Sequence, residues 1–95
     1  MPLPPVSVGI VTWHPDDLLA RCVASVRAQD YPDLDLHIWD NGTTDASRAL
    51  VGGLTADAER TFSAENLGFA GGHNALIRRS RGAYYLCLNP DAVLS

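Results

Sequence analysis

One short run of this chain carries residue types that suit the binding of an anion. Between Glu65 and Asn74, the sequence Glu-Asn-Leu-Gly-Phe-Ala-Gly-Gly-His-Asn holds three glycines and two asparagines. Glycine lets a backbone approach a ligand closely, and the apolar residues and arginines that follow predict a helix whose positive end lies at the glycines. The run therefore favours a phosphate site at a helix N-terminus. A plain glycine-rich turn with asparagine caps is the alternative.

Asp91 is the carboxylate that is best placed to hold a metal ion. It follows an apolar, strand-like segment and the rigid Pro90, in the turn sequence Asn-Pro-Asp that begins at Asn89. Mg²⁺ and Mn²⁺ are hard cations that proteins hold with one or two carboxylates together with the phosphates of a ligand. Asp91 is therefore a candidate ligand for Mg²⁺ or Mn²⁺, and a capped Asx-Pro turn is the alternative.

Other polar and aromatic residues stand where strand-like segments end. Asp40 can accept hydrogen bonds from a nucleobase or a ribose, and a simple Asp-Asn-Gly turn is the alternative. His14 and His73 lie in the two expected ligand loops, where each could reach a phosphate; the histidine spacing does not indicate a metal cluster. Trp13 and Trp39 are expected to pack in the core, with stacking on a base as the alternative.

Alternating strands and helices are expected to position these residues. Short apolar or alternating segments predict strands at 6–13, 34–39, 60–63 and 83–88, and spaced apolar residues with capping signals predict helices at 15–29, 44–54 and 70–79. The order β-α-β-α-β-α-β predicts an α/β, Rossmann-like parallel sheet with helices on its faces. Ligands bind such sheets outside the carboxyl ends of the strands, which is where the polar residues stand.

Composition sets limits on the partners of the chain. The 95 residues, 46% of them hydrophobic, are those of one globular domain or part of one, and we take 1–95 as a single unit. A net charge of −4 argues against nucleic acid as a partner. Cys22 and Cys87 are far apart and lie in apolar stretches, so we expect both to be buried. The N-terminus lacks signal-peptide character and no apolar stretch is long enough to cross a membrane, so the expected location is the cytoplasm.

Four motifs together resemble a known family. They are Val-Ser-Val-Gly-Ile-Val-Thr-Trp at 6–13, Trp-Asp-Asn-Gly-Thr-Thr-Asp at 39–45, the glycine-rich run at 65–74, and Leu-Asn-Pro-Asp-Ala at 88–92. The chain resembles the N-terminal, nucleotide-binding half of a family 2 glycosyltransferase with the GT-A fold, and most closely the rhamnosyltransferase-type members. The resemblance covers nearly the whole chain.

The resemblance assigns roles to several residues. It implies that Asp40 contacts a pyrimidine base, that Thr12 lines the same pocket, and that Asn66 lies against the nucleotide. Asp91 stands at the second Asp of the family's Asp-X-Asp motif and would be the metal ligand, while Asn89 replaces the first Asp and leaves one carboxylate. The expected nucleotide-binding set is Thr12, Trp13, His14, Asp40, Asn66, Gly68, Gly71, Asn89 and Asp91.

The resemblance also implies an activity. Family members transfer a sugar with inversion, here with rhamnose as the expected sugar, from a dTDP- or UDP-sugar to a saccharide acceptor in polysaccharide biosynthesis, in the cytoplasm or peripherally at the inner face of the membrane. They run to more than twice this length and supply a general base after the Asp-X-Asp strand. This chain ends four residues past Asp91. We therefore expect a truncated GT-A domain that binds nucleotide weakly, is inactive alone, and self-associates through its exposed sheet.

Three other functions also use a nucleotide-binding α/β fold. A non-catalytic nucleotide-binding or interaction module that keeps the GT-A fold stays open. A dinucleotide-binding or methyltransferase-type domain would need its glycines directly after the first strand, where this chain has Thr12-Trp13-His14-Pro15. A sugar nucleotidyltransferase would need a glycine-rich loop at the same place.

Overall fold

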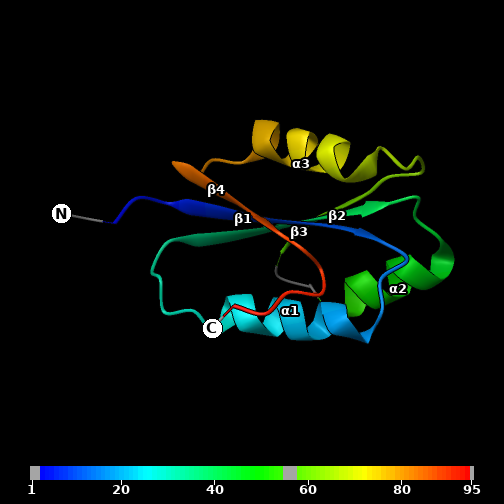
Figure 1. The fold of residues 1–95 in the computed structure, drawn as a ribbon, viewed down its shortest axis with the longest axis horizontal. Coiled ribbons are helices and arrows are strands. Elements are labelled where there is room, and N and C mark those ends of the chain that lie inside the picture. The colour runs from blue at the N-terminus through cyan, green and yellow to red at the C-terminus, as the bar shows by residue number, and fades with distance from the viewer. Residues whose placement is uncertain (1–2, 55–57, 95) are drawn as a thin grey trace.

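A computed structural model describes residues 3–54 and 58–94, and in these ranges strands and helices alternate as the sequence predicts. The elements are β1 (Val6–Trp13), α1 (Asp17–Arg27), β2 (Leu34–Asn41), α2 (Asp45–Leu54), β3 (Glu59–Phe62), α3 (Gly68–Arg79) and β4 (Tyr84–Leu88). The strands form one parallel sheet in the order β3-β2-β1-β4. Helix α3 covers one face of the sheet, and α1 and α2 cover the other (Figure 1). The predicted α/β class with a parallel sheet is confirmed.

Strand β1 is central because it is apolar on both faces. Its residues from Ser7 to Thr12 are all buried, as expected of a strand with helices above and below it. On the face of α1 and α2, Val8 and Ile10 join a core with Leu19, Cys22, Val23, Val26, Ile38, Val51 and Leu88. On the face of α3, Val11 packs with Trp39, Ala75 and Leu76. These two cores fix the positions of both helix layers relative to the strand ends.

The strand order places a topological switch point next to β1. The chain passes from β1 to β2 and β3 on one side, and then returns to place β4 on the other side of β1. Because all the strands are parallel, their carboxyl ends lie at one edge of the sheet. Ligands of open parallel sheets bind at such a switch point, here between the ends of β1 and β4.

Most element boundaries differ from the sequence-based expectation by one to two residues, and two of the differences affect the site. Strand β2 continues through Asp40 and Asn41, because these residues pair in register with Thr12 and Trp13 of β1. Helix α3 begins at Gly68, so the glycines lie inside its first turns and do not precede it.

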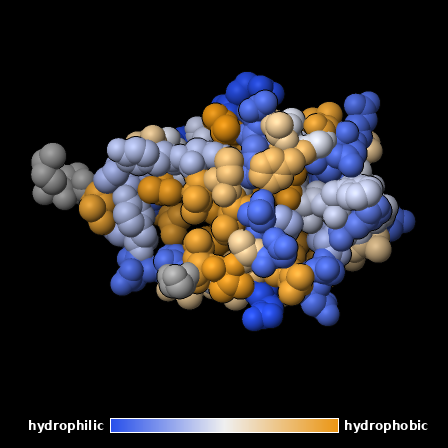
Figure 2. Space-filling model, in the orientation of Figure 1, coloured by the Kyte–Doolittle hydropathy of each residue, from blue (hydrophilic) through white to orange (hydrophobic). Residues whose placement is uncertain are grey.

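Strand β4 is an exposed edge. Tyr84 and Leu86 are exposed, and hydrophobic residues gather on the face over which β4 and the following segment run (Figures 1 and 2). The expectation that both cysteines are buried is wrong for Cys87, which is exposed, whereas Cys22 is buried. The reason is that α3 packs mainly over β1 and β2 and leaves this part of β4 uncovered. No helix in the described ranges is long and apolar enough to cross a membrane.

Candidate functional site

Two adjoining pockets lie at the carboxyl edge of the sheet, where the switch point predicts a ligand site. One, of about 300 Å³, is lined by Thr12, Trp13, His14, Pro15, Asp16, Leu18, Leu19, Asn89, Pro90 and Asp91, and we call it the acidic pocket. The other, of about 310 Å³, is lined by Val11, Thr12, Trp13, Asn41, Asn66, Gly68, Phe69 and Pro90, and we call it the amide pocket. The end of β1 and Pro90 are common to both. The edge therefore offers one site with two compartments.

The acidic pocket gathers oxygen atoms from the ends of β1 and β4. Asn89 and Asp91 are exposed, and their turn is closed by the Ala92 N–H, which donates to the Asn89 carbonyl at 3.0 Å. From α1, the Cys22 thiol donates to the same carbonyl at 3.4 Å. Burial, and secondly the nearby Asp91 carboxylate, raises the pKa of Cys22 to about 11, so the thiol keeps its proton for this contact. Helix α1 thus holds the turn that carries Asp91.

The oxygen donors of the acidic pocket fit a hard divalent cation. A carboxylate of Asp91, an amide oxygen of Asn89 and the hydroxyl of Thr12 are the ligand types that Mg²⁺ and Mn²⁺ prefer. The Thr12 Oγ1 is buried and has no hydrogen-bond partner in the described part of the chain. An orphaned buried hydroxyl at a pocket wall is consistent with a missing polar partner.

The amide pocket has aromatic walls and uncharged polar groups. Trp13 is 59% exposed and Phe69 is 52% exposed, while Asn41 and Asn66 supply amides. The expectation that Trp13 packs in the core is therefore wrong; it is right for Trp39, which is buried. Trp13 is the last residue of β1, and its ring contacts the His14 ring at a centroid distance of 4.4 Å. The exposed part of the ring offers a surface on which a flat ligand can stack.

Asn41 was not among the predicted site residues. Its side-chain oxygen accepts the Trp39 Nε1–H at 2.9 Å and the Leu67 N–H at 3.1 Å, and its Nδ2 donates to the Gly68 carbonyl at 3.0 Å. It therefore fastens the start of α3 to the end of β2. The alternation of side chains along a strand could have identified this role of Asn41. Consecutive residues of a strand point to opposite faces of the sheet, so Asn41 points toward α3 while Asp40 points away from it.

Asp40 lies outside the lining of both pockets. Its carboxylate is fully buried, with Oδ2 accepting from Ser47 Oγ at 2.7 Å and from Thr43 Oγ1 at 2.9 Å. Its Oδ1 has no partner within the described residues. The carboxylate ties the end of β2 to the start of α2, and its contact with a base stays a prediction.

The glycine-rich run is divided between the site and the core. The Asn66 Oδ1 accepts the Gly68 N–H at 2.9 Å, and Gly68 has a positive φ of 76° that favours glycine. Both residues line the amide pocket, whereas Gly71 does not. A Cβ on Gly71 would lie 2.9 Å from the Leu67 Cβ, so this glycine serves the tight entry into the helix.

The two histidines of the expected ligand loops, His14 and His73, differ in their surroundings. His14 lines the acidic pocket, is exposed, and has a left-handed φ of 51°. The expectation that His73 reaches a phosphate is wrong, because position 73 is on the buried face of α3. Its Nδ1 lies 2.7 Å from the Tyr85 hydroxyl, and burial lowers the pKa of His73.

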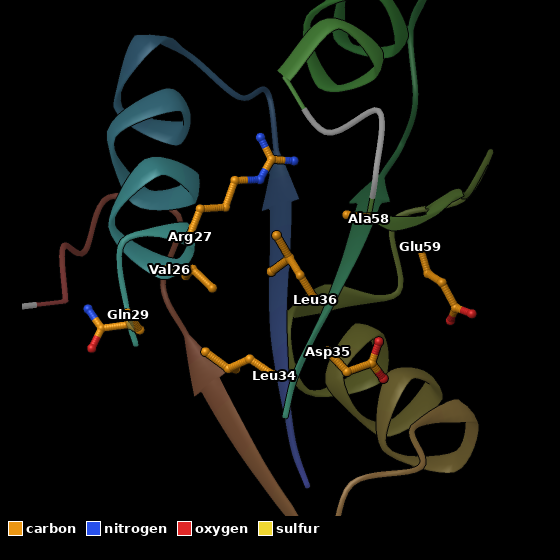
Figure 3. A pocket seen from close by; sticks show the side chains of 8 residues that line it. All are labelled: Val26, Arg27, Gln29, Leu34, Asp35, Leu36, Ala58 and Glu59. Carbon is orange, nitrogen blue, oxygen red and sulfur yellow. The ribbon is translucent and has the colours of Figure 1, made fainter. Parts of the chain in front are cut away.

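A further pocket lies at the opposite edge of the sheet, where β2 and β3 begin. This pocket is lined by Val26, Arg27, Gln29, Leu34, Asp35, Leu36, Ala58 and Glu59. Figure 3 shows that Leu34 and Leu36 point to the α1 side of the sheet and Asp35 points to the opposite side. None of the predicted site residues lines it, so the carboxyl edge is the better candidate.

Comparison with known proteins decides the family of the chain. The family model described as "Glycosyl transferase family 2" matches residues 7–95. The chain belongs to glycosyl transferase family 2. The resemblance seen in the sequence is thus confirmed at the level of the family.

Relatives of this glycosyl transferase family 2 chain include much longer proteins. It is 31% identical to the chondroitin synthase of Escherichia coli over 97% of its own length, but it spans 14% of that protein. It is 28% identical to the GalNAc(5)-diNAcBac-PP-undecaprenol beta-1,3-glucosyltransferase of Campylobacter jejuni over 94% of its length, and spans 30% of that enzyme.

Solved structures of glycosyltransferases share the fold of this family 2 chain. The mannosyltransferase PcManGT from Pyrobaculum calidifontis, solved in complex with GDP-Man and Mn²⁺, has a TM-score of 0.82 and 25% identity; the match covers 95% of this chain and 28% of that one. TarS of S. aureus has a TM-score of 0.78 and 20% identity, covering 92% and 16% of the two chains. The Rossmann-like part of a GT-A fold is therefore confirmed.

Proposed function

We propose that the chain is the donor-binding part of a glycosyltransferase, which transfers a sugar from a nucleoside diphosphate sugar to a saccharide acceptor and uses Mg²⁺ or Mn²⁺. One observation carries this proposal: the two pockets at the carboxyl edge bring together seven of the nine predicted nucleotide-binding residues, Thr12, Trp13, His14, Asn66, Gly68, Asn89 and Asp91. Family membership supports the reaction class.

The two compartments suit the two ends of a nucleoside diphosphate. The amide pocket would take the base, with Trp13 as a stacking surface and the amides of Asn41 and Asn66 nearby. The acidic pocket would take the diphosphate through a cation on Asp91. When bound, the cation neutralises the charge of the departing diphosphate. The chain's own residues orient the donor and hold the leaving group.

The reaction that we propose is an inverting displacement at the anomeric carbon. The acceptor oxygen forms a bond to that carbon as the bond to the diphosphate oxygen breaks, and the acceptor proton passes to a general base. We assign no residue of this chain to the base. The chain resembles rhamnosyltransferase-type members of the family. On this ground we propose rhamnose as the transferred sugar and dTDP or UDP as the nucleotide that carries it.

The proposed acceptor is a growing saccharide at the inner face of the membrane. The names of the relatives, a chondroitin synthase and an undecaprenol-linked glucosyltransferase, support polysaccharide assembly as the process. We propose a cytoplasmic or peripheral membrane location on the same ground.

Calorimetric titration tests the donor site. UDP, dTDP and GDP would each be titrated with and without Mn²⁺; GDP is included because PcManGT was solved with GDP-Man. We expect binding that depends on Mn²⁺, is lost in Asp91→Ala, and is retained in the control Asp33→Ala, which removes a carboxylate at the other edge of the sheet. A chain that is folded by circular dichroism but binds none of the nucleotides would refute the proposal.

A non-catalytic nucleotide-binding module remains the competing function. The amide at Asn89, where the family motif has a carboxylate, is the observation that favours it. Binding of nucleotide without sugar transfer by the longest natural form of the protein would decide for this alternative.

A further inference from the structure

Asp16 is a carboxylate of the acidic pocket that the family motif does not include. It is the N-cap of α1, and its Oδ1 accepts the Leu18 N–H at 2.9 Å. Asp16 lines the same pocket of about 300 Å³ as Asp91. Its neighbour Asp17 is also exposed but is not part of the lining. The cap fixes one oxygen of Asp16, while Oδ2 makes no hydrogen bond within the described residues.

The charge of the acidic pocket limits what it can bind. Two carboxylates line it, the chain has no lysine, and none of the arginines is among the lining residues. Asp16 and Asp91 would repel an anionic diphosphate unless a cation lay between the two carboxylates and the phosphate groups. A divalent cation with two carboxylates on one side and phosphate oxygens on the other would resolve this conflict.

A second, independent feature points to a ligand at the same place. The Thr12 side chain is only 2% exposed, lines the acidic pocket, and has an Oγ1 without a partner in the described residues. A buried hydroxyl left without a partner destabilises the fold, so a polar partner is expected to reach it. A cation with its bound water, held at the pocket wall, would supply one.

We propose that Asp16 provides the second carboxylate for the divalent cation, in place of the one that is missing at Asn89. This inference rests on the proposed function. The left-handed backbone at His14 turns the chain from the end of β1 into α1 and brings Asp16 to the pocket. No group of three or more acidic, histidine or cysteine side chains in the described ranges can hold a metal unaided. Two carboxylates completed by ligand phosphates are instead the usual arrangement for Mg²⁺.

Mn²⁺ binding, measured by electron paramagnetic resonance in the presence of UDP, dTDP or GDP, tests this role without any measurement of turnover. The variant is Asp16→Asn, because asparagine also caps helices well and should preserve α1. The matched control is Asp17→Asn, which removes the same charge one residue away. We expect Asp16→Asn to weaken Mn²⁺ binding by about 10-fold or more, as losses around metal sites do, and Asp17→Asn to leave it within about twofold of the wild type.

A rescue variant separates loss of a ligand from loss of the fold. Asn89→Asp, added to Asp16→Asn, restores a second carboxylate from β4 and should recover most of the Mn²⁺ affinity. Equal affinities of Asp16→Asn and Asp17→Asn would overturn the role of Asp16 and leave the proposed function intact. A wild-type chain that binds Mn²⁺ with none of the three nucleotides would overturn both.

Discussion

Tyr85 and His73 form a partly buried polar contact between the edge strand and α3. The Tyr85 hydroxyl lies over Gly9 of β1, where a Cβ would collide with it, and meets His73 Nδ1 at 2.7 Å. Burial raises the pKa of Tyr85 and lowers that of His73, so both are neutral near pH 7. The His73 Nε2 is buried without a partner in the described residues, which makes charging of the ring costly.

His73 is therefore expected to make stability depend on pH. Its pKa is lowered from 6.5 in the folded state, so the unfolded chain binds the proton more readily, and stability falls as the pH drops below about 6.5. Urea unfolding between pH 5 and pH 8 would show a smaller loss on acidification in His73→Leu than in the wild type. The same measurement on His14→Leu, at an exposed histidine, is the matched control. Parallel curves for the wild type and His73→Leu would exclude this origin.

At the residue scale, the sequence predicted which residues gather at the carboxyl edge better than it predicted which way side chains point. Asn66 and Asp91 lie at the carboxyl edge as expected, because parallel strands bring their ends together. Orientation within an element depends on tertiary packing. For this reason the sequence did not predict that His73 is buried on α3 or that the Trp13 ring is exposed.

Helix α3 packs against the sheet at Gly72 with too little room for a side chain at that position. A Cβ at position 72 would lie 2.9 Å from both Cγ atoms of Val11 and 3.1 Å from Trp39 Cδ1. The close contact of Gly72 with Val11 and Trp39 fixes the start of α3 against the ends of β1 and β2, and so also positions Gly68 and Asn66. The glycine-rich run therefore has a packing role besides any contact with a ligand.

The same substitution at two helical glycines should have opposite effects. Gly72→Ala is expected to destabilise the fold by about 1–3 kcal/mol, because β-branched Val11 and buried Trp39 have little room to move. Gly53→Ala in α2, where a Cβ would meet nothing within 4 Å, should stabilise the fold by up to about 1 kcal/mol. Chemical denaturation of both variants measures the difference, and equal effects would contradict the close packing of α3.

At the element scale, the strands and helices were predictable and their arrangement only in part. The apolar stretch at 6–13 and the spaced apolar residues of α1 are local signals, and both elements were found. The parallel sheet followed from the alternation of strands and helices. The position of β4 beside β1 could not be predicted from this alternation. It depends on contacts that join distant parts of the chain, such as the contact between Tyr85 and His73.

The whole molecule presents β4 as an open edge. Within the described residues β4 pairs with β1 alone, and Tyr84 is 65% exposed on it. An unpaired strand with apolar side chains is a template for pairing with another chain. We propose this edge as the surface for the self-association expected from the sequence.

Light scattering at micromolar concentrations tests this surface. We expect the chain to form dimers or larger species, and Tyr84→Lys to shift it toward the monomer, because lysine on an edge strand opposes pairing. Ile77→Lys, at an apolar residue that is 47% exposed on α3, should leave the association unchanged. A monodisperse wild-type monomer would rule out the role of this edge.

The end of β1 is common to both compartments of the site, since Thr12 and Trp13 line each of them together with Pro90. In the proposed site, a base that shifts the Trp13 ring would also move a wall of the acidic pocket, and a cation that draws in Thr12 would reshape the amide pocket. The affinities for base and cation would then be linked through these shared residues. Thermodynamic reciprocity then requires that the nucleoside change the affinity for the cation by the same factor as the cation changes that for the nucleoside.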